Sequence, residues 1–73
     1  QGDANAQYNL GVMYDNGQGV LQDYVMAHIY LNIAAVNGDK SAIKNRGIVE
    51  KKMTPSQLEK AQDLAREWMR NHQ

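Results

Sequence analysis

The residues of this chain that could bind a metal or move a proton are its two histidines, His28 and His72. Asp23 lies five residues before His28, a spacing at which a helix does not align two metal ligands, and no second histidine stands four residues from either imidazole. The chain has no cysteine, no Gly-x-Ser-x-Gly motif and no close carboxylate pair to support catalysis. We therefore expect no metal, no cofactor and no catalytic residue, and an enzyme is the least favoured class of function.

The segment Gly17-Gln18-Gly19 shares only its glycines with a phosphate-binding loop, because the following Lys and Ser/Thr and the preceding strand are missing. It is better explained as a turn. The formal net charge is zero, which argues against nucleic acid as the main partner. No apolar run approaches the roughly 18 residues of a membrane span, and we expect no membrane partner. The sequence shows no signal peptide and begins at Gln1 rather than at Met, as expected for a fragment of a longer protein.

Two rows of mostly polar residues are the better candidates for binding. Asn5, Asn9, Val12 and Asn16 recur at helical spacing, and the residues 36 positions later are Ser41, Asn45, Ile48 and Lys52. If two such helices stack side by side, these rows line a groove whose amide and hydroxyl groups can bind a peptide backbone. The alternative is an ordinary solvated face, since every surface helix needs a polar side.

Four helices are required to position these rows. Asp3 can cap a first helix that runs to about Asn16, with Ala6, Leu10, Met13 and Tyr14 as its apolar stripe. Gly17 and Gly19 provide the turn, and Asp23 can cap a second helix that ends at Asn37-Gly38. The third helix is expected from about Lys40 to Lys51. Thr54-Pro55-Ser56-Gln57 is a capping box with proline at the first helical position, and it starts the fourth.

The pattern repeats along the chain. Gly2-Asp3-Ala4-Asn5-Ala6 matches Gly38-Asp39-Lys40-Ser41-Ala42 at an offset of 36, and Gly11 matches Gly47 at the same offset. A repeat of this length is typical of stacked helical hairpins. We predict an all-α solenoid of two antiparallel hairpins, with a complete repeat over 1–38 and a degenerate C-terminal repeat over 39–73 that ends in a capping helix.

The first copy resembles the Sel-one-like repeat of the tetratricopeptide-repeat superfamily. The matching pattern is Ala6-x-x-x-Leu10-Gly11-x-x-Tyr14-x-x-Gly17-x-Gly19-Val20-x-x-Asp23-x-x-x-Ala27-x-x-Tyr30-x-x-x-Ala34-Ala35-x-x-Gly38. The second copy keeps Gly38, Ala42, Gly47 and Ala61 but has Met53-Thr54-Pro55 in place of the Gly-x-Gly turn. The resemblance implies an adaptor that binds proteins on its concave face and catalyses nothing. It also allows an exported or periplasmic location, which the sequence itself does not determine.

The resulting hypothesis is a non-catalytic scaffold module whose partner is a protein or a peptide. The rival hypothesis is a purely structural cap of a longer solenoid, with recognition by upstream repeats. Self-association is a further expectation, because residues up to Asp39 carry a net charge of −4 and those from Lys40 a net charge of +4.

Overall fold

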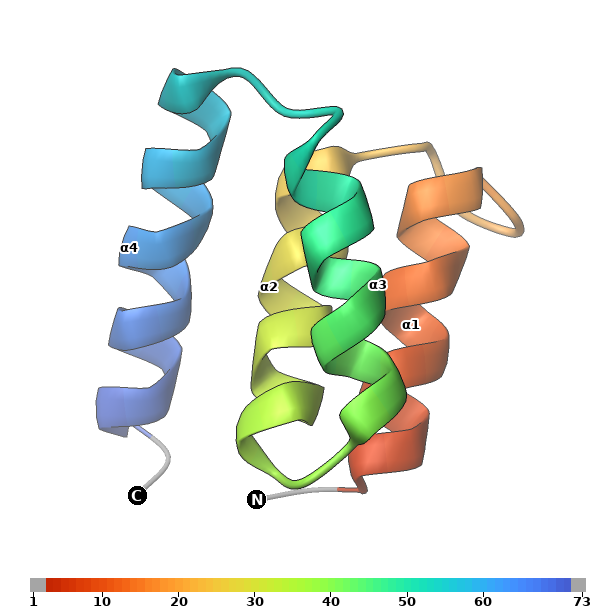
Figure 1. The fold of residues 1–73 in the computed structure, drawn as a ribbon, viewed down its shortest axis with the longest axis vertical. Helices are drawn as coiled ribbons and strands as arrows, with labels where there is room; N and C mark the ends of the chain where they lie inside the picture. Colours follow the sequence, from red (N-terminus) through yellow and green to blue (C-terminus); the bar gives the residue numbers. More distant parts are fainter. Residues whose placement is uncertain (1–2, 72–73) are drawn as a thin grey trace.

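The computed structural model describes residues 3–71 and contains four helices in that range: α1 (Ala4–Asn16), α2 (Tyr24–Val36), α3 (Lys40–Glu50) and α4 (Pro55–Asn71) (Figure 1). The all-α class and the four helices agree with the prediction from the sequence. His72 lies outside the described residues. Over residues 3–71, no helix is both long and apolar enough to cross a membrane.

Short polar side chains start every helix by binding backbone N–H groups that have no partner within the helix. The carboxylates of Asp3, Asp23 and Asp39 accept hydrogen bonds from the first turns of α1, α2 and α3. At α4 the capping box is reciprocal: the Gln57 N–H donates to Thr54 Oγ1 at 3.1 Å, and the Thr54 N–H donates to Gln57 Oε1 at 3.0 Å. These bonds are local, which is why the sequence predicts the helix starts closely.

Glycines with positive φ end the first two helices. Gly17 has φ of 70° and its N–H donates to the Met13 carbonyl, so α1 closes with a left-handed C-cap. After α2 it is Gly38, with φ of 100°, that takes the left-handed conformation, while Asn37 stays at −86°. The side chain of Asn37 instead donates to the buried Gln7 Oε1 at 2.9 Å. The end of α2 is thereby joined to α1.

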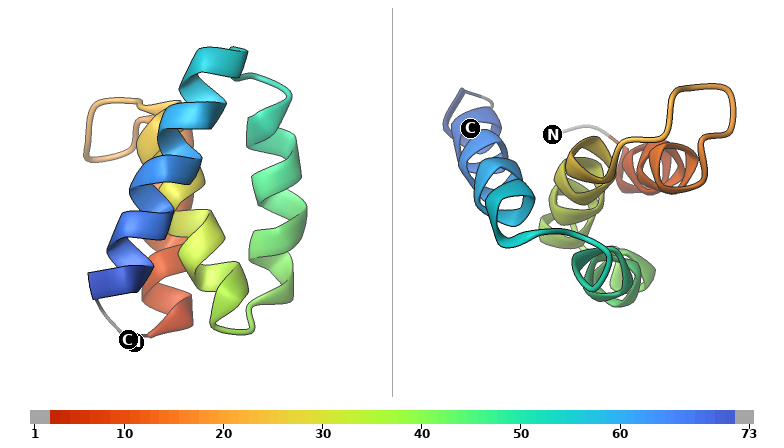
Figure 2. Two further views of the ribbon diagram at one scale, coloured as in Figure 1. Left: turned by 90° about the vertical axis from the view of Figure 1, so that its left-hand side faces the viewer. Right: turned by 90° about the horizontal axis from the view of Figure 1, so that it is seen from above.

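The second helix is the centre of the molecule. The chain runs up and down in alternation, and α2 packs against α1, α3 and α4 (Figure 1). Viewed from above, α1, α2 and α4 lie nearly in a row with α3 in front of it (Figure 2). One core cluster contains Ala27, Leu31 and Ala34 of α2 with Ala42 and Val49 of α3. The other joins Ile29 and Ile33 of α2 to Ala61 of α4.

The face that α1 buries differs from the predicted stripe. Gln7 and Gly11 are its buried residues, whereas Ala6 is exposed and Leu10 and Met13 are half-buried. Including Ala6 in the core was therefore wrong. The reason is that Gly11 lets α1 approach α2 closely, and the amide of Gln7 has a hydrogen-bond partner there. This arrangement leaves the face of Ala6, Leu10 and Met13 only partly covered.

The last helix packs mainly against α2 and much less against α3. Ala61 and Ala65 are its buried residues, and Trp68 also packs on the α2 cluster. As a consequence, none of the described helices covers Gly47 of α3, and a Cβ at this position would meet no atom within 4 Å. A Cβ at Gly11 of α1, in contrast, would clash with Leu31 of α2. Ile43, one turn before Gly47, is 50% exposed. The two copies of the repeat thus bury different faces of their first helices.

Candidate peptide-binding surface

The predicted row on α1 lies on the side of the helix opposite α2. Helical spacing separates Asn5, Asn9 and Asn16 from the buried Gln7 and Gly11. These three asparagines are exposed, and Val12 is half-buried. Their amide groups are therefore accessible to a partner.

The predicted row on α3 is accessible in the same way: Ser41, Ile48 and Lys52 are exposed, and Asn45 is half-buried. The buried residues of α3, Ala42 and Val49, pack on α2. We call the combined surface of Asn5, Asn9, Val12, Asn16, Ser41, Asn45, Ile48 and Lys52 the α1/α3 face.

Two members of this face hold α1 and α3 side by side. The Asn45 side-chain N–H donates to the Tyr8 hydroxyl oxygen at 2.9 Å, and Lys52 Nζ lies 3.1 Å from Asp15 Oδ1. Lys52 Nζ also lies 5.7 Å from the centroid of the Tyr24 ring, a cation–π distance. Asn45 and Lys52 therefore already have partners within the chain, and they define the seam between the helices.

Two further lysines of this surface were not predicted from the sequence. Lys44 and Lys51 are exposed and stand four residues before and three residues after Ile48, so all three side chains share one side of α3. The same spacing was present in the sequence, and it could have identified them. With these two lysines, the α1/α3 face has exposed amides on α1 and a basic stripe with an apolar centre on α3.

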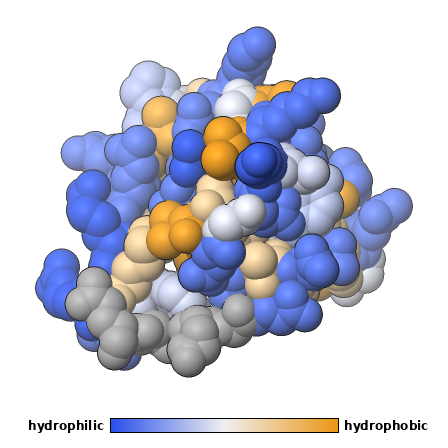
Figure 3. Space-filling view, turned by 60° about the horizontal axis from the view of Figure 1, so that its bottom comes forward, coloured by the Kyte–Doolittle hydropathy of each residue, from blue (hydrophilic) through white to orange (hydrophobic). Residues whose placement is uncertain are grey.

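Exposed apolar side chains are not confined to this face. Ile48 is 44% exposed, but Leu21, Val36 and Ile43 are more exposed still. The space-filling view from below likewise shows apolar residues at the surface in small patches among hydrophilic ones (Figure 3). Ile48 is distinguished by its lysine and amide neighbours rather than by its exposure.

A polar hollow of about 390 Å³ lies between α3 and α4, with α2 as its floor. Its lining residues are His28, Asn32, Arg46, Glu50, Gln62 and Arg66. His28 is only 2% exposed, and its Nε2 lies 2.8 Å from Glu50 Oε2. Because a carboxylate only accepts hydrogen bonds, Nε2 carries the hydrogen.

The partner of His28 was not found from the sequence, where this histidine had no convincing partner. Glu50 lies 22 residues away and becomes a neighbour only when α3 packs on α2. Among residues 3–71, no group of three or more His, Cys, Asp or Glu side chains could hold a metal ion. The geometry gives His28 a structural role in joining two helices.

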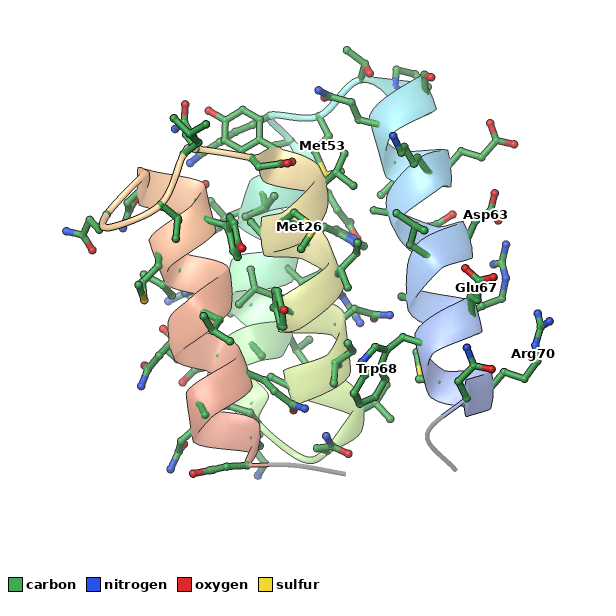
Figure 4. The ribbon with its side chains drawn as sticks, turned by 180° about the vertical axis from the view of Figure 1, so that it is seen from behind. Met26, Met53, Asp63, Glu67, Trp68 and Arg70 are labelled. Carbon is green, nitrogen blue, oxygen red and sulfur yellow. The ribbon has the colours of Figure 1, made fainter. Side chains whose placement is uncertain are left out.

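An apolar groove of about 340 Å³ lies on the other side of α2, where α4 meets it. Trp68 points from α4 toward α2, while Arg70 points away (Figure 4). Met26, Ile29 and Ile33 contribute from α2, with Glu67 on the rim. Tyr30, which also lines this groove, stacks on Tyr14 of α1 with ring centroids 5.8 Å apart.

Comparison with known proteins adds to this geometry. The family model described as Sel1 repeat matches residues 4–39. The crystal structure of c5321, a protective antigen present in uropathogenic Escherichia coli strains and displaying an SLR fold, is similar with a TM-score of 0.88 and 38% sequence identity. The match covers 96% of this chain but only 15% of that protein. No curated protein matches the chain significantly.

Proposed function

Because this chain belongs to the Sel1 repeat family, whose repeats generally mediate protein interactions, we propose that it is a non-catalytic module that binds a peptide segment of a partner protein on its α1/α3 face. The observation that carries the proposal is the side-by-side placement of α1 and α3 by the Asn45–Tyr8 and Lys52–Asp15 contacts. These contacts hold two rows of accessible side chains at a fixed spacing.

The chemistry of the face indicates what kind of segment it takes. The exposed amides of Asn5, Asn9 and Asn16 can both donate to and accept from a peptide backbone. Ile48 offers an apolar contact, and Lys44 and Lys51 on either side of it favour an acidic neighbour. The partner segment is therefore an extended, acidic peptide with an apolar side chain.

A structural cap is the second candidate, and the composition of α4 favours it. Glu59, Asp63, Arg66, Glu67 and Arg70 are all exposed on this helix, as suits the polar end of a helical stack. In this alternative, other repeats of the longer protein bind the partner, and the α1/α3 face is only solvated.

Selection of short random peptides on the chain, followed by mutation, separates the two candidates. The double variant Asn9→Ala with Ile48→Ala removes an amide and the apolar centre of the face, while both residues that form the seam remain. Val36→Ala, at another exposed apolar site, is the matched control. Selected acidic peptides should bind the control normally and the double variant at least about tenfold more weakly, since two contacts are lost.

Two results would contradict the peptide-binding proposal. One is a failure to select any peptide that binds the folded chain. The other is equal binding by the double variant, which would move the binding site away from the α1/α3 face. The first result favours the structural cap, and the second places peptide binding on another surface of the chain.

A further inference from the structure

The polar hollow between α3 and α4 follows from the way that α4 packs. On α1, the side that carries Gln7 and Gly11 is covered by α2. The matching side of α3, which carries Ile43 and Gly47, remains open because α4 contacts mainly α2. The space of about 390 Å³ that results is lined by side chains of three helices, all of them polar. A hollow of this composition is suited to a polar ligand rather than to an apolar anchor.

Two hydrogen-bonded pairs fix the floor and one wall of the hollow. His28 on α2 is joined to Glu50 on α3 at 2.8 Å. Arg46 on α3 donates through Nη1 to Asn32 Oδ1 on α2 at 2.6 Å. Both pairs cross from one helix to the other, so the side chains are held in place before any ligand binds. Such preorganisation lowers the entropic cost of binding.

Most of the hydrogen-bond donors around the hollow are unused. A guanidinium group has five N–H donors, and within residues 3–71 Arg46 donates one short bond, to Asn32. In the same range, the carboxamide nitrogen of Asn32 and the whole carboxamide of Gln62 have no hydrogen-bond partner. Arg66 pairs only with Asp63 on its own helix, and both side chains are exposed, a kind of pair that contributes little and exchanges readily. The unused groups are therefore mainly donors.

The charge of the hollow points to a singly charged anion. Among the lining residues, Arg46 and Arg66 contribute two positive charges, and Glu50 contributes one negative charge that His28 and Arg46 already contact. Asp63, which pairs with Arg66 on the exposed side of α4, is not one of the lining residues. A carboxylate balances the remaining positive charge, whereas a dianion would leave a negative excess beside Glu50. Guanidinium groups also match carboxylates geometrically, with two parallel N–H bonds.

We propose that this hollow binds a carboxylate group between Arg46 on α3 and Arg66 on α4, with the amides of Asn32 and Gln62 as further donors. The carboxylate comes either from an acidic side chain of a partner protein or from a free organic acid. The site lies between α3 and α4 and is separate from the α1/α3 face, so either site can exist without the other.

Nuclear magnetic resonance titration of the chain tests the site directly. The probes are a short capped peptide with one glutamate, the same peptide with glutamine in its place, acetate and inorganic phosphate. Saturable shifts are expected for the side-chain amides of Asn32 and Gln62 and for the Arg46 Nε–H on adding the glutamate peptide, and not on adding the glutamine peptide. Tighter binding of the glutamate peptide than of acetate identifies a protein side chain as the source, and equal binding identifies a free acid.

Matched variants separate this site from general charge effects. Arg66→Gln should weaken carboxylate binding about tenfold, the loss expected for one charge-assisted contact. Arg70→Gln removes the same charge one turn further along α4, where the side chain points away from α2, and should leave binding unchanged (Figure 4). Gln62→Glu places a negative charge in the hollow and should abolish binding while the chain stays folded.

Three outcomes would overturn the proposal: equal binding by Arg66→Gln and the unmodified chain, equal binding of the glutamine peptide, or tighter binding of phosphate than of any carboxylate. Substitution of Lys44 and Lys51 by Gln distinguishes the two sites. This substitution should weaken the binding of peptides to the α1/α3 face. The chemical-shift changes that the glutamate peptide causes at the side-chain amides of Asn32 and Gln62 should persist.

Discussion

Leu31 lies so close to Gly11 that a Cβ added to the glycine would be 2.7 Å from Leu31 Cγ and 3.2 Å from the Ala27 carbonyl oxygen. Alanine normally stabilises a helix by about 1 kcal/mol relative to glycine. Here, overpacking against a fully buried leucine costs about 1–3 kcal/mol, so Gly11→Ala should have a lower net stability. A urea melt measures this, and a variant as stable as the original chain would show that α1 and α2 are not in close contact at this point.

Gly47 is the matched position in the second copy, and the opposite result is expected there. A Cβ at Gly47 meets nothing within 4 Å. Gly47→Ala should therefore raise the free energy of unfolding by roughly 0.5–1 kcal/mol through helix propensity and the smaller entropy of the unfolded chain. The same urea melt measures the gain. If Gly47→Ala is destabilising, then another helix covers this face of α3.

Loss of Glu50 should leave the buried His28 without its acceptor. In residues 3–71 the other ring nitrogen, Nδ1, is buried without a hydrogen-bond partner, so Glu50 holds the ring alone. Glu50→Ala should cost about 1–3 kcal/mol, the penalty for an unsatisfied buried donor. Thermal melts compare it with Glu50→Gln, which keeps an acceptor oxygen, and with the exposed Glu59→Ala, for which a change within about 0.5 kcal/mol is expected. Equal effects of Glu50→Ala and Glu59→Ala would mean that His28 does not depend on this contact.

Self-association should involve the partly covered face of α1, formed by Ala6, Leu10 and Met13. This face belongs to the acidic half of the chain, and the other half is basic, so unlike ends of two copies attract. Sedimentation velocity over a range of protein and salt concentrations should show association that weakens with salt. Ala6→Lys places a positive charge on the face and should give a monomer. A chain that is monomeric at every concentration would exclude association through this surface.

The helices were predictable because their signals are local. Asp3, Asp23, Asp39 and Thr54 each bind N–H groups two or three residues away, and those spacings are visible in the sequence. Gly11 also lies inside a helical pattern, where glycine costs about 1 kcal/mol relative to alanine, and the close contact with Leu31 explains its presence there. Local patterns determine where helices start, but they leave open which helix covers which face and therefore which of the helical glycines is covered.

Contacts between helices could not be predicted from the sequence. Gln7 is buried because Asn37 satisfies its amide from 30 residues away, so a polar residue took the core position where an apolar one was expected. The offset of 36 suggested that Gly11 and Gly47 are equivalent, yet only Gly11 is covered. The polar hollow depends on the same choice of packing partner by α4. Its six lining residues form one pair at four-residue spacing on each of three helices, and nothing in the sequence connects one pair with another.

Because α4 packs mainly on α2, it is less firmly held than the other three helices. Its buried residues are Ala61 and Ala65, two small side chains, while α2 is enclosed by three neighbours. Undocking α4 exposes Ile29, Ile33 and Trp68 but leaves the contacts among α1, α2 and α3 in place. Local unfolding of such a unit requires less free energy than global unfolding. Backbone amides of α4 should exchange their hydrogens with solvent through this local unfolding. Those of α2 should exchange much more slowly, because they require global unfolding.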